Sequence, residues 1–120
     1  MYVDRGTITV YVSDMARAIG FYSETLGLPV AYRGGSGFTA IAAGGGWNIG
    51  LHATHPGSPT PRARGALSVG FAVADLDAAI ATLRGRGLAL DSPPPSVGGI
   101  RLAHFTDPDG NPLYLYQVAG

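Results

Sequence analysis

Two stretches of the chain alternate apolar and polar residues with the period of a half-buried strand. In residues 7–12, three branched apolar side chains alternate with Thr7, Thr9 and Tyr11. Residues 68–73 alternate in the same way. Because successive side chains of a strand point to opposite faces of the sheet, each stretch predicts a strand with one buried face.

Each predicted strand runs into a predicted helix with a recognisable start and stop. Asp14 and Asp75 stand where a helix N-cap is expected, and apolar residues at helical spacing follow each of them. Gly27 and Gly87 end the two patterns and suit left-handed C-terminal caps. The residues of the two helices match at one constant offset, which indicates an internal duplication.

The rest of the chain completes two similar modules. After each helix, short apolar segments separated by glycine or proline predict three further strands: 28–32, 38–42 and 47–52 in the first half, and 88–91, 100–106 and 113–118 in the second. We therefore predict a single α+β domain of two tandem βαβββ modules, over about 5–53 and 66–118, joined by a proline-rich linker over about 53–65. One helix per module can cover only one face of a sheet, so we expect a cupped mixed sheet with its helices on the outer face.

Composition narrows the possible functions. Eight basic residues balance eight acidic ones in 120 residues, which excludes a nucleic-acid protein built on a broad basic face. The chain has no cysteine, and therefore no thiolate metal site or disulfide, and no apolar run as long as a membrane span. We expect a cytoplasmic protein that contacts neither nucleic acid nor membrane.

The alternate residues of the predicted strands would line the cup, and they are the candidate ligand-binding residues. Three of them are tyrosines, which offer stacking faces with polar tips, although aromatic residues also favour strands for packing alone. The candidate set is Thr7, Thr9, Tyr11, Trp47, Asn48, His52, Ser68, Tyr114 and Tyr116.

Several of these candidates have a second interpretation. His52 is the best single candidate for polar recognition or for a general base, although a lone histidine is more often a hydrogen-bonded structural residue than a catalyst. Trp47 could stack on a ligand, plug the edge of the sheet or contact a second chain. The facing direction of His104 is open, because its neighbour Phe105 competes for the inner face. Arg101 could meet an anionic ligand or lie in solvent.

The chain resembles the vicinal oxygen chelate superfamily of glyoxalases, bleomycin resistance proteins and extradiol dioxygenases. The resemblance covers about residues 7–117 and rests on motifs that occur in order. They are Val12-Ser13-Asp14-Met15 followed by Phe21-Tyr22 and Leu26-Gly27-Leu28, then Val73-Ala74-Asp75-Leu76, and finally Phe105-Thr106-Asp107-Pro108-Asp109-Gly110-Asn111.

The resemblance also implies where a metal would be bound. Metal-dependent members place ligands on the first and last strand of each module, and the matching positions here are Thr7, Gly50, Ser68 and Tyr114, with His52 two residues after Gly50. Such positions usually hold histidine or glutamate. A single imidazole does not hold a divalent ion against water, so we expect no metal and no cofactor.

Two functions follow from the resemblance. The first is a small-molecule binding protein like the bleomycin resistance proteins, which sequesters an aromatic or extended ligand and acts as a homodimer. The second is a metal-independent isomerase, cyclase or lyase that uses His52 as base and Tyr114 or Tyr116 as acid. A metal-dependent glyoxalase or dioxygenase would need ligands that are missing, and no catalytic residue is assigned.

Overall fold

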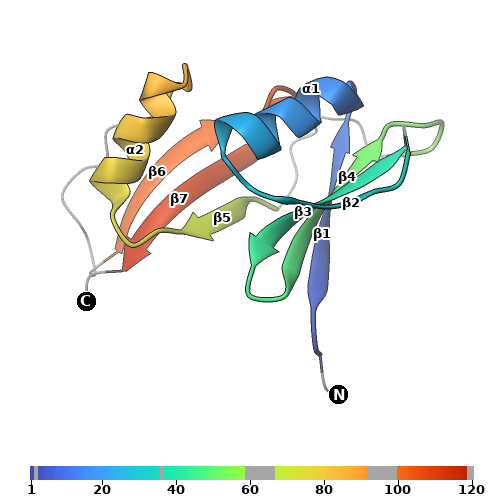
Figure 1. Cartoon of the computed structure of the whole chain (residues 1–120), viewed down its shortest axis with the longest axis horizontal. Helices are drawn as coiled ribbons and strands as arrows, with labels where there is room; N and C mark the ends of the chain where they lie inside the picture. The colour runs from blue at the N-terminus through green and yellow to red at the C-terminus, as the bar shows by residue number, and fades with distance from the viewer. Residues whose placement is uncertain (2, 36, 59–66, 92–99, 119–120) are drawn as a thin grey trace. The chain divides into compact units, whose positions relative to one another are not determined.

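The computed structural model describes residues 1, 3–35, 37–58, 67–91 and 100–118 (Figure 1). The chain forms two compact units, Met1–Arg64 with Pro108–Asn111, and Gly65–Asp107 with Pro112–Gly120. No helix in the described ranges is long and apolar enough to cross a membrane.

The first unit is a four-stranded mixed sheet with helical turns between its first two strands. Its elements are β1 (Gly6–Val12), α1 (Met15–Ile19), η1 (Gly20–Thr25), β2 (Val30–Arg33), β3 (Phe38–Gly44) and β4 (Trp47–Ala53). The strand order is β1-β4-β3-β2, with β1 and β4 parallel and the other pairs antiparallel. Ile41 of β3 and Ile49 and Leu51 of β4, which lie on the same face of the sheet, are almost fully buried, as are Ala18 and Tyr22 of the helical segment. These residues form the core of this unit.

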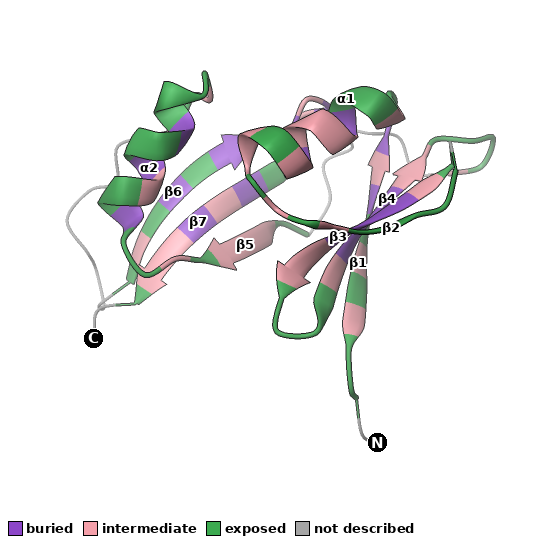
Figure 2. Cartoon of the chain, in the orientation of Figure 1, coloured by how far each residue is buried: buried purple, intermediate pink, exposed green. Residues whose placement is uncertain are grey.

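In its described residues, 67–91, 100–107 and 112–118, the second unit repeats the scheme with one strand fewer. It consists of β5 (Val69–Ala72), α2 (Leu76–Gly85), β6 (Ile100–Thr106) and β7 (Pro112–Val118). The strand order is β5-β7-β6, with β5 parallel and β6 antiparallel to β7. Buried positions alternate with more exposed ones along β6 and β7 (Figure 2). The predicted α+β class and the strand–helix–strand order of both modules are confirmed.

Both predicted helix caps are confirmed. The carboxylate of Asp14 accepts a hydrogen bond from the Arg17 amide at 3.0 Å, and that of Asp75 accepts one from the Ala78 amide at the same distance. Each bond satisfies an amide that has no partner inside the helix. At the other ends Gly27 and Gly87 have φ of 77° and 89°, the left-handed conformation that glycine adopts without strain.

Three details differ from the sequence-based prediction. Residues 20–25 form a π-helix, in which the Leu26 amide donates to the carbonyl of Phe21, five residues back. Residues 88–91 form no strand, and the sheets have four and three strands where eight strands in one sheet were expected. At the start of this segment the Leu88 amide donates to the Leu83 carbonyl and so belongs to the C-terminal cap of α2, and at its end the Asp91 amide donates to the His104 carbonyl of β6.

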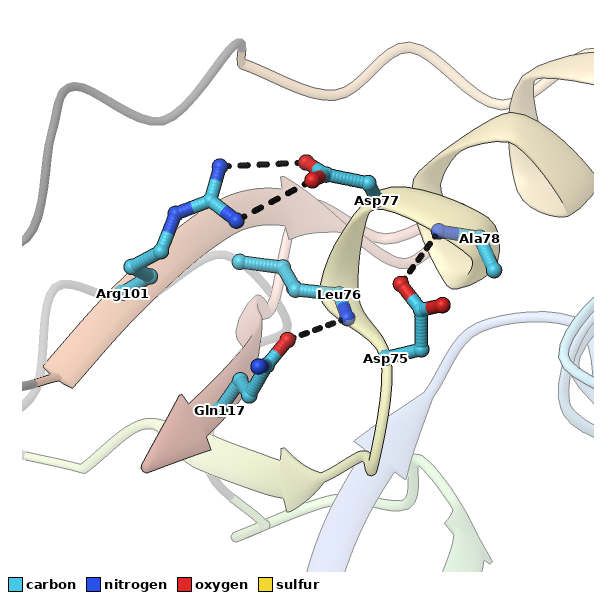
Figure 3. A network of polar contacts seen from close by, with 6 residues as sticks. All are labelled: Asp75, Leu76, Asp77, Ala78, Arg101 and Gln117. Atoms are coloured by element: carbon cyan, nitrogen blue, oxygen red, sulfur yellow. Dashed lines mark hydrogen bonds and ion pairs between the residues drawn. The ribbon is translucent and has the colours of Figure 1, made fainter. Parts of the chain in front are cut away.

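The start of α2 is fastened to its sheet by side chains (Figure 3). Arg101 of β6 donates two hydrogen bonds to the carboxylate of Asp77, at 3.0 and 3.3 Å. The side-chain oxygen of Gln117 in β7 accepts from the Leu76 amide at 2.6 Å. Together with the Asp75 cap, these contacts fix one face of the sheet under the helix.

Candidate functional site

The open face of the first unit is the face of its sheet opposite the buried core. The register of β1 on β4 aligns Thr7 with Asn48, Thr9 with Gly50 and Tyr11 with His52. In β3, Phe38 pairs with His52, so its ring belongs to the same face. The structure therefore brings together on one surface the candidate residues Thr7, Thr9, Tyr11, Asn48 and His52.

Aromatic rings surround His52 on this open face. Its ring centroid lies 5.6 Å from that of Tyr11, 5.7 Å from His55 and 6.0 Å from Phe38. Neither His55 nor Phe38 was among the ligand-binding residues predicted from the sequence. Phe38 could have been predicted from the hairpin formed by β3 and β4, because the register of that hairpin places Phe38 opposite His52. We call these four residues the His52 cluster.

The imidazoles of the His52 cluster are held by neighbouring carbonyl groups. Nδ1 of His52 lies 3.2 Å from the carbonyl oxygen of Ala53, and Nδ1 of His55 lies 3.0 Å from that of Pro56. Because a carbonyl oxygen can only accept, each Nδ1 is the protonated nitrogen, and the neutral ring then has its lone pair on Nε2. Among the described residues neither Nε2 has a hydrogen-bond partner. The cluster can therefore accept a hydrogen bond or a proton.

Gly50 lies next to this cluster, and the space that its missing side chain would occupy is filled by neighbouring side chains. A Cβ atom on Gly50 would lie 3.0 Å from Cε1 of Phe38 and 3.0 Å from Cγ2 of Thr7. Those two side chains already occupy the space above the glycine, and Gly50 is itself buried. The absence of a side chain at position 50 thus positions the ring of Phe38 against the strand.

A turn from the end of the chain supports the backbone of this face. The carboxylate of Asp109 accepts hydrogen bonds from the Ser13 amide, at 3.2 and 3.3 Å, and from the Ser13 hydroxyl. The side-chain amide of Asn111 donates to the carbonyl oxygen of Tyr11 at 3.4 Å. The carboxylate of Asp109 thus bonds a residue 96 positions away along the chain.

The second unit has an open face of the same kind. The register of its three strands aligns Gly70 with Tyr114 and His104, and Ala72 with Tyr116 and Leu102. The ring centroid of Tyr114 lies 6.0 Å from that of His104 and 5.9 Å from that of Tyr116. The sequence left open which face of the sheet His104 occupies. In the structure His104 lies on the same face as the tyrosines, and Phe105 is buried on the other face.

Gly70 determines how Tyr114 lies on this second open face. A Cβ atom on Gly70 would overlap Cζ and Cε2 of the Tyr114 ring, and would lie 2.6 Å from its hydroxyl oxygen. The Tyr114 ring therefore packs over Gly70 of the neighbouring strand β5. Any larger residue at position 70 would displace the ring. The face presents the phenols as a partly exposed aromatic surface.

Two candidate residues lie outside these surfaces. Ser68 precedes β5, is exposed, and its hydroxyl donates to the carbonyl oxygen of Pro112 at 3.0 Å. Trp47 is half-exposed and aligns with Gly6 in the register of β1 on β4, on the face of Ile49. A Cβ atom on Gly6 would overlap the indole ring, which therefore packs on that glycine.

The metal-ligand positions of the resemblance do not fit a divalent cation. Within the described ranges, no group of three or more histidine, cysteine, aspartate or glutamate side chains is placed to hold a metal ion. The Thr7 methyl group packs over Gly50, and the Ser68 hydroxyl is committed to a backbone carbonyl. A hydroxyl, a glycine and a phenol are poor ligands for a resident divalent ion, so no chemical step is derived through a metal.

The comparisons with known proteins agree with this architecture. TnmS3, an antibiotic binding protein from Streptomyces sp. CB03234, is 32% identical, with 98% of this chain and 96% of that chain covered and a TM-score of 0.80. A glyoxalase/bleomycin resistance protein from the same strain is also 32% identical, covering 92% and 97% of the two chains, with a TM-score of 0.74. A virulence protein from Salmonella typhimurium is 25% identical, covering 98% and 99%, with a TM-score of 0.76.

No curated protein sequence matches the chain significantly. The model of one protein family matches residues 5–115, nearly the full length of both units. The chain therefore belongs to the Glyoxalase/Bleomycin resistance protein/Dioxygenase superfamily.

Proposed function

We propose that the protein binds an aromatic or extended small molecule on its open faces and sequesters it without changing it chemically. The observation that carries the proposal is the aromatic surface of the second unit, where Gly70 lets the Tyr114 ring lie beside Tyr116 and His104. Stacked rings with polar tips suit a planar ligand that has polar groups at its edge. The likeness to an antibiotic binding protein at 32% identity supports the same function class.

The proposal is tested by titrating the protein with planar aromatic compounds, with the dissociation constant measured by calorimetry. Replacing Tyr114 or Tyr116 with alanine should weaken binding by about 1–3 kcal/mol, since each removes one stacking surface. Trp47→Ala is the aromatic control, because Trp47 lies on the other face of its own sheet, and should leave the affinity unchanged. Unchanged affinity in both tyrosine variants would contradict the proposed site.

A second candidate function is metal-independent isomerisation, cyclisation or elimination with His52 as general base. It is favoured by one observation: Nδ1 of His52 is held by the Ala53 carbonyl, which leaves Nε2 as the proton acceptor. Incubation of the protein with a bound ligand, followed by mass spectrometry, separates the two functions. A ligand recovered unchanged supports sequestration, and a converted ligand supports catalysis.

The proposal includes assembly as a homodimer. Exposed strand edges and apolar side chains are usually covered in stable proteins, and Ile100 and Val118 of the described strands are about half exposed, at 46% and 61%. Sedimentation at micromolar concentration should give twice the 12.3 kDa mass of one chain. A species of 12.3 kDa alone would contradict this part of the proposal.

A further inference from the structure

In the His52 cluster, one ring nitrogen of His52 is a hydrogen-bond donor and the other is an acceptor. The Ala53 carbonyl oxygen accepts a hydrogen bond from Nδ1–H of His52, and in this tautomer the lone pair of the ring is at Nε2. The rings of Tyr11 and Phe38 lie within 6.0 Å of it, centroid to centroid, and supply flat apolar surface. A ligand that stacks there meets a hydrogen-bond acceptor at its edge.

The same open face carries no formal charge in the residues that the structure describes. Its register positions on β1, β3 and β4 are occupied by Thr, Tyr, Phe, Ala, Asn, Gly and His. In the second unit, Arg101 aligns with Gln117 on the covered face and is paired with Asp77. A charged ligand would therefore lose hydration without gaining an opposite charge from these faces.

We infer that the ligand of the His52 cluster is an uncharged planar aromatic molecule with an O–H or N–H group at its edge, which donates to Nε2 of His52. The inference rests on the proposed function, since it names the ligand class of one of the two open faces of that binding protein, the face of the first unit. It also makes His52 a specificity residue, because an analogue without the donor leaves Nε2 unpaired.

The experiment compares three probes with the same ring system: 2-naphthol, 2-methoxynaphthalene and 2-naphthoate. Titrations followed by nuclear magnetic resonance should show the tightest binding for 2-naphthol. Because the cluster is partly open to solvent, the loss of one hydrogen bond should weaken the methoxy probe roughly three- to tenfold. The carboxylate probe should bind more weakly than 2-naphthol as well.

Variants of His52 test the assignment to this residue. His52→Leu should bring 2-naphthol and 2-methoxynaphthalene to equal affinity, whereas His52→Gln, which keeps an acceptor oxygen, should retain part of the preference. Thermal unfolding of both variants verifies that they fold.

The outcomes separate this inference from the proposed function. Equal binding of 2-naphthol and 2-methoxynaphthalene to the unmodified protein overturns the inference and leaves aromatic binding intact. Tighter binding of 2-naphthoate overturns the claim that the ligand is uncharged, and a preference that survives in His52→Leu overturns the role of His52. Failure of all three probes to bind contradicts the proposed function itself.

Discussion

Replacing Gly70 with alanine should damage ligand binding while leaving the fold intact. The added Cβ would overlap the far end of the Tyr114 ring, which is partly exposed and can swing away. Displacing a ring from its rotamer costs about 0.5–1.5 kcal/mol. Gly70 does not have a positive φ, so alanine also restricts the unfolded chain and returns about 0.4–1 kcal/mol. The two effects nearly cancel in the free energy of unfolding.

The same substitution removes Tyr114 from its place beside Tyr116. We therefore expect Gly70→Ala to weaken binding of a planar ligand by about 1–3 kcal/mol, as much as Tyr114→Ala does. The double variant should bind no worse than Tyr114→Ala alone, because both changes remove one stacking surface.

Calorimetric titration and thermal unfolding, carried out on the same samples, provide the two measurements. Gly85→Ala is the matched control: a Cβ at Gly85 meets nothing within 4 Å, and that glycine ends α2. The control should bind normally and be slightly more stable. Normal binding by Gly70→Ala, or its unfolding under native conditions, would refute the reasoning about the ring.

Three further predictions concern stability. Asp109→Ala leaves the Ser13 amide without its carboxylate and should lower the free energy of unfolding by about 1.5–3 kcal/mol, measured by urea denaturation; a loss below 0.5 kcal/mol would contradict it. Asp75→Ala removes the N-cap of α2 and should cost about 1 kcal/mol in the same assay, against almost nothing if the cap were unimportant. Hydrogen bonds from Arg101, with its positive charge, lower the pKa of the Asp77 carboxyl, so this pair stabilises the fold at neutral pH and stops doing so as the pH falls through that pKa. Asp77→Asn should therefore lower the melting temperature slightly at pH 7, and this difference should shrink as the pH falls below 3.8, the ordinary pKa of the carboxyl; an effect that does not change with pH would rule out the ion pair as the cause.

Local signals in the sequence were sufficient to predict the helix N-caps and which residues of a strand share a face. Asp14 and Asp75 act within three residues of themselves, and the alternation of β1 needs no distant partner. Odd and even positions of one strand face opposite sides of the sheet, so the alternation of β4 was also sufficient to predict that Trp47 and Asn48 lie on opposite faces.

Other features depend on contacts that a linear pattern does not contain. The ring of Tyr114 covers Gly70, 44 positions earlier, and the two meet only because β5 and β7 pair in that register. Residues 28–32 and 88–91 both follow a helix-ending glycine, and the leucine amide donates back into the helical segment in both, yet only the first segment contains a strand. Apolar residues after a glycine do not reveal whether a strand will pair there.

The hydrogen bonds between Asp109 and Ser13 have a consequence for synthesis on the ribosome. The first unit is not continuous in the chain, because Pro108–Asn111 belongs to it. A growing chain exposes Ser13 early, yet the carboxylate that accepts a hydrogen bond from the Ser13 amide belongs to Asp109 and is made 96 positions later. A chain truncated before Pro108 would therefore damage the amino-terminal unit as well as the carboxyl-terminal one. The amino-terminal unit can therefore finish folding only after most of the carboxyl-terminal unit has been made.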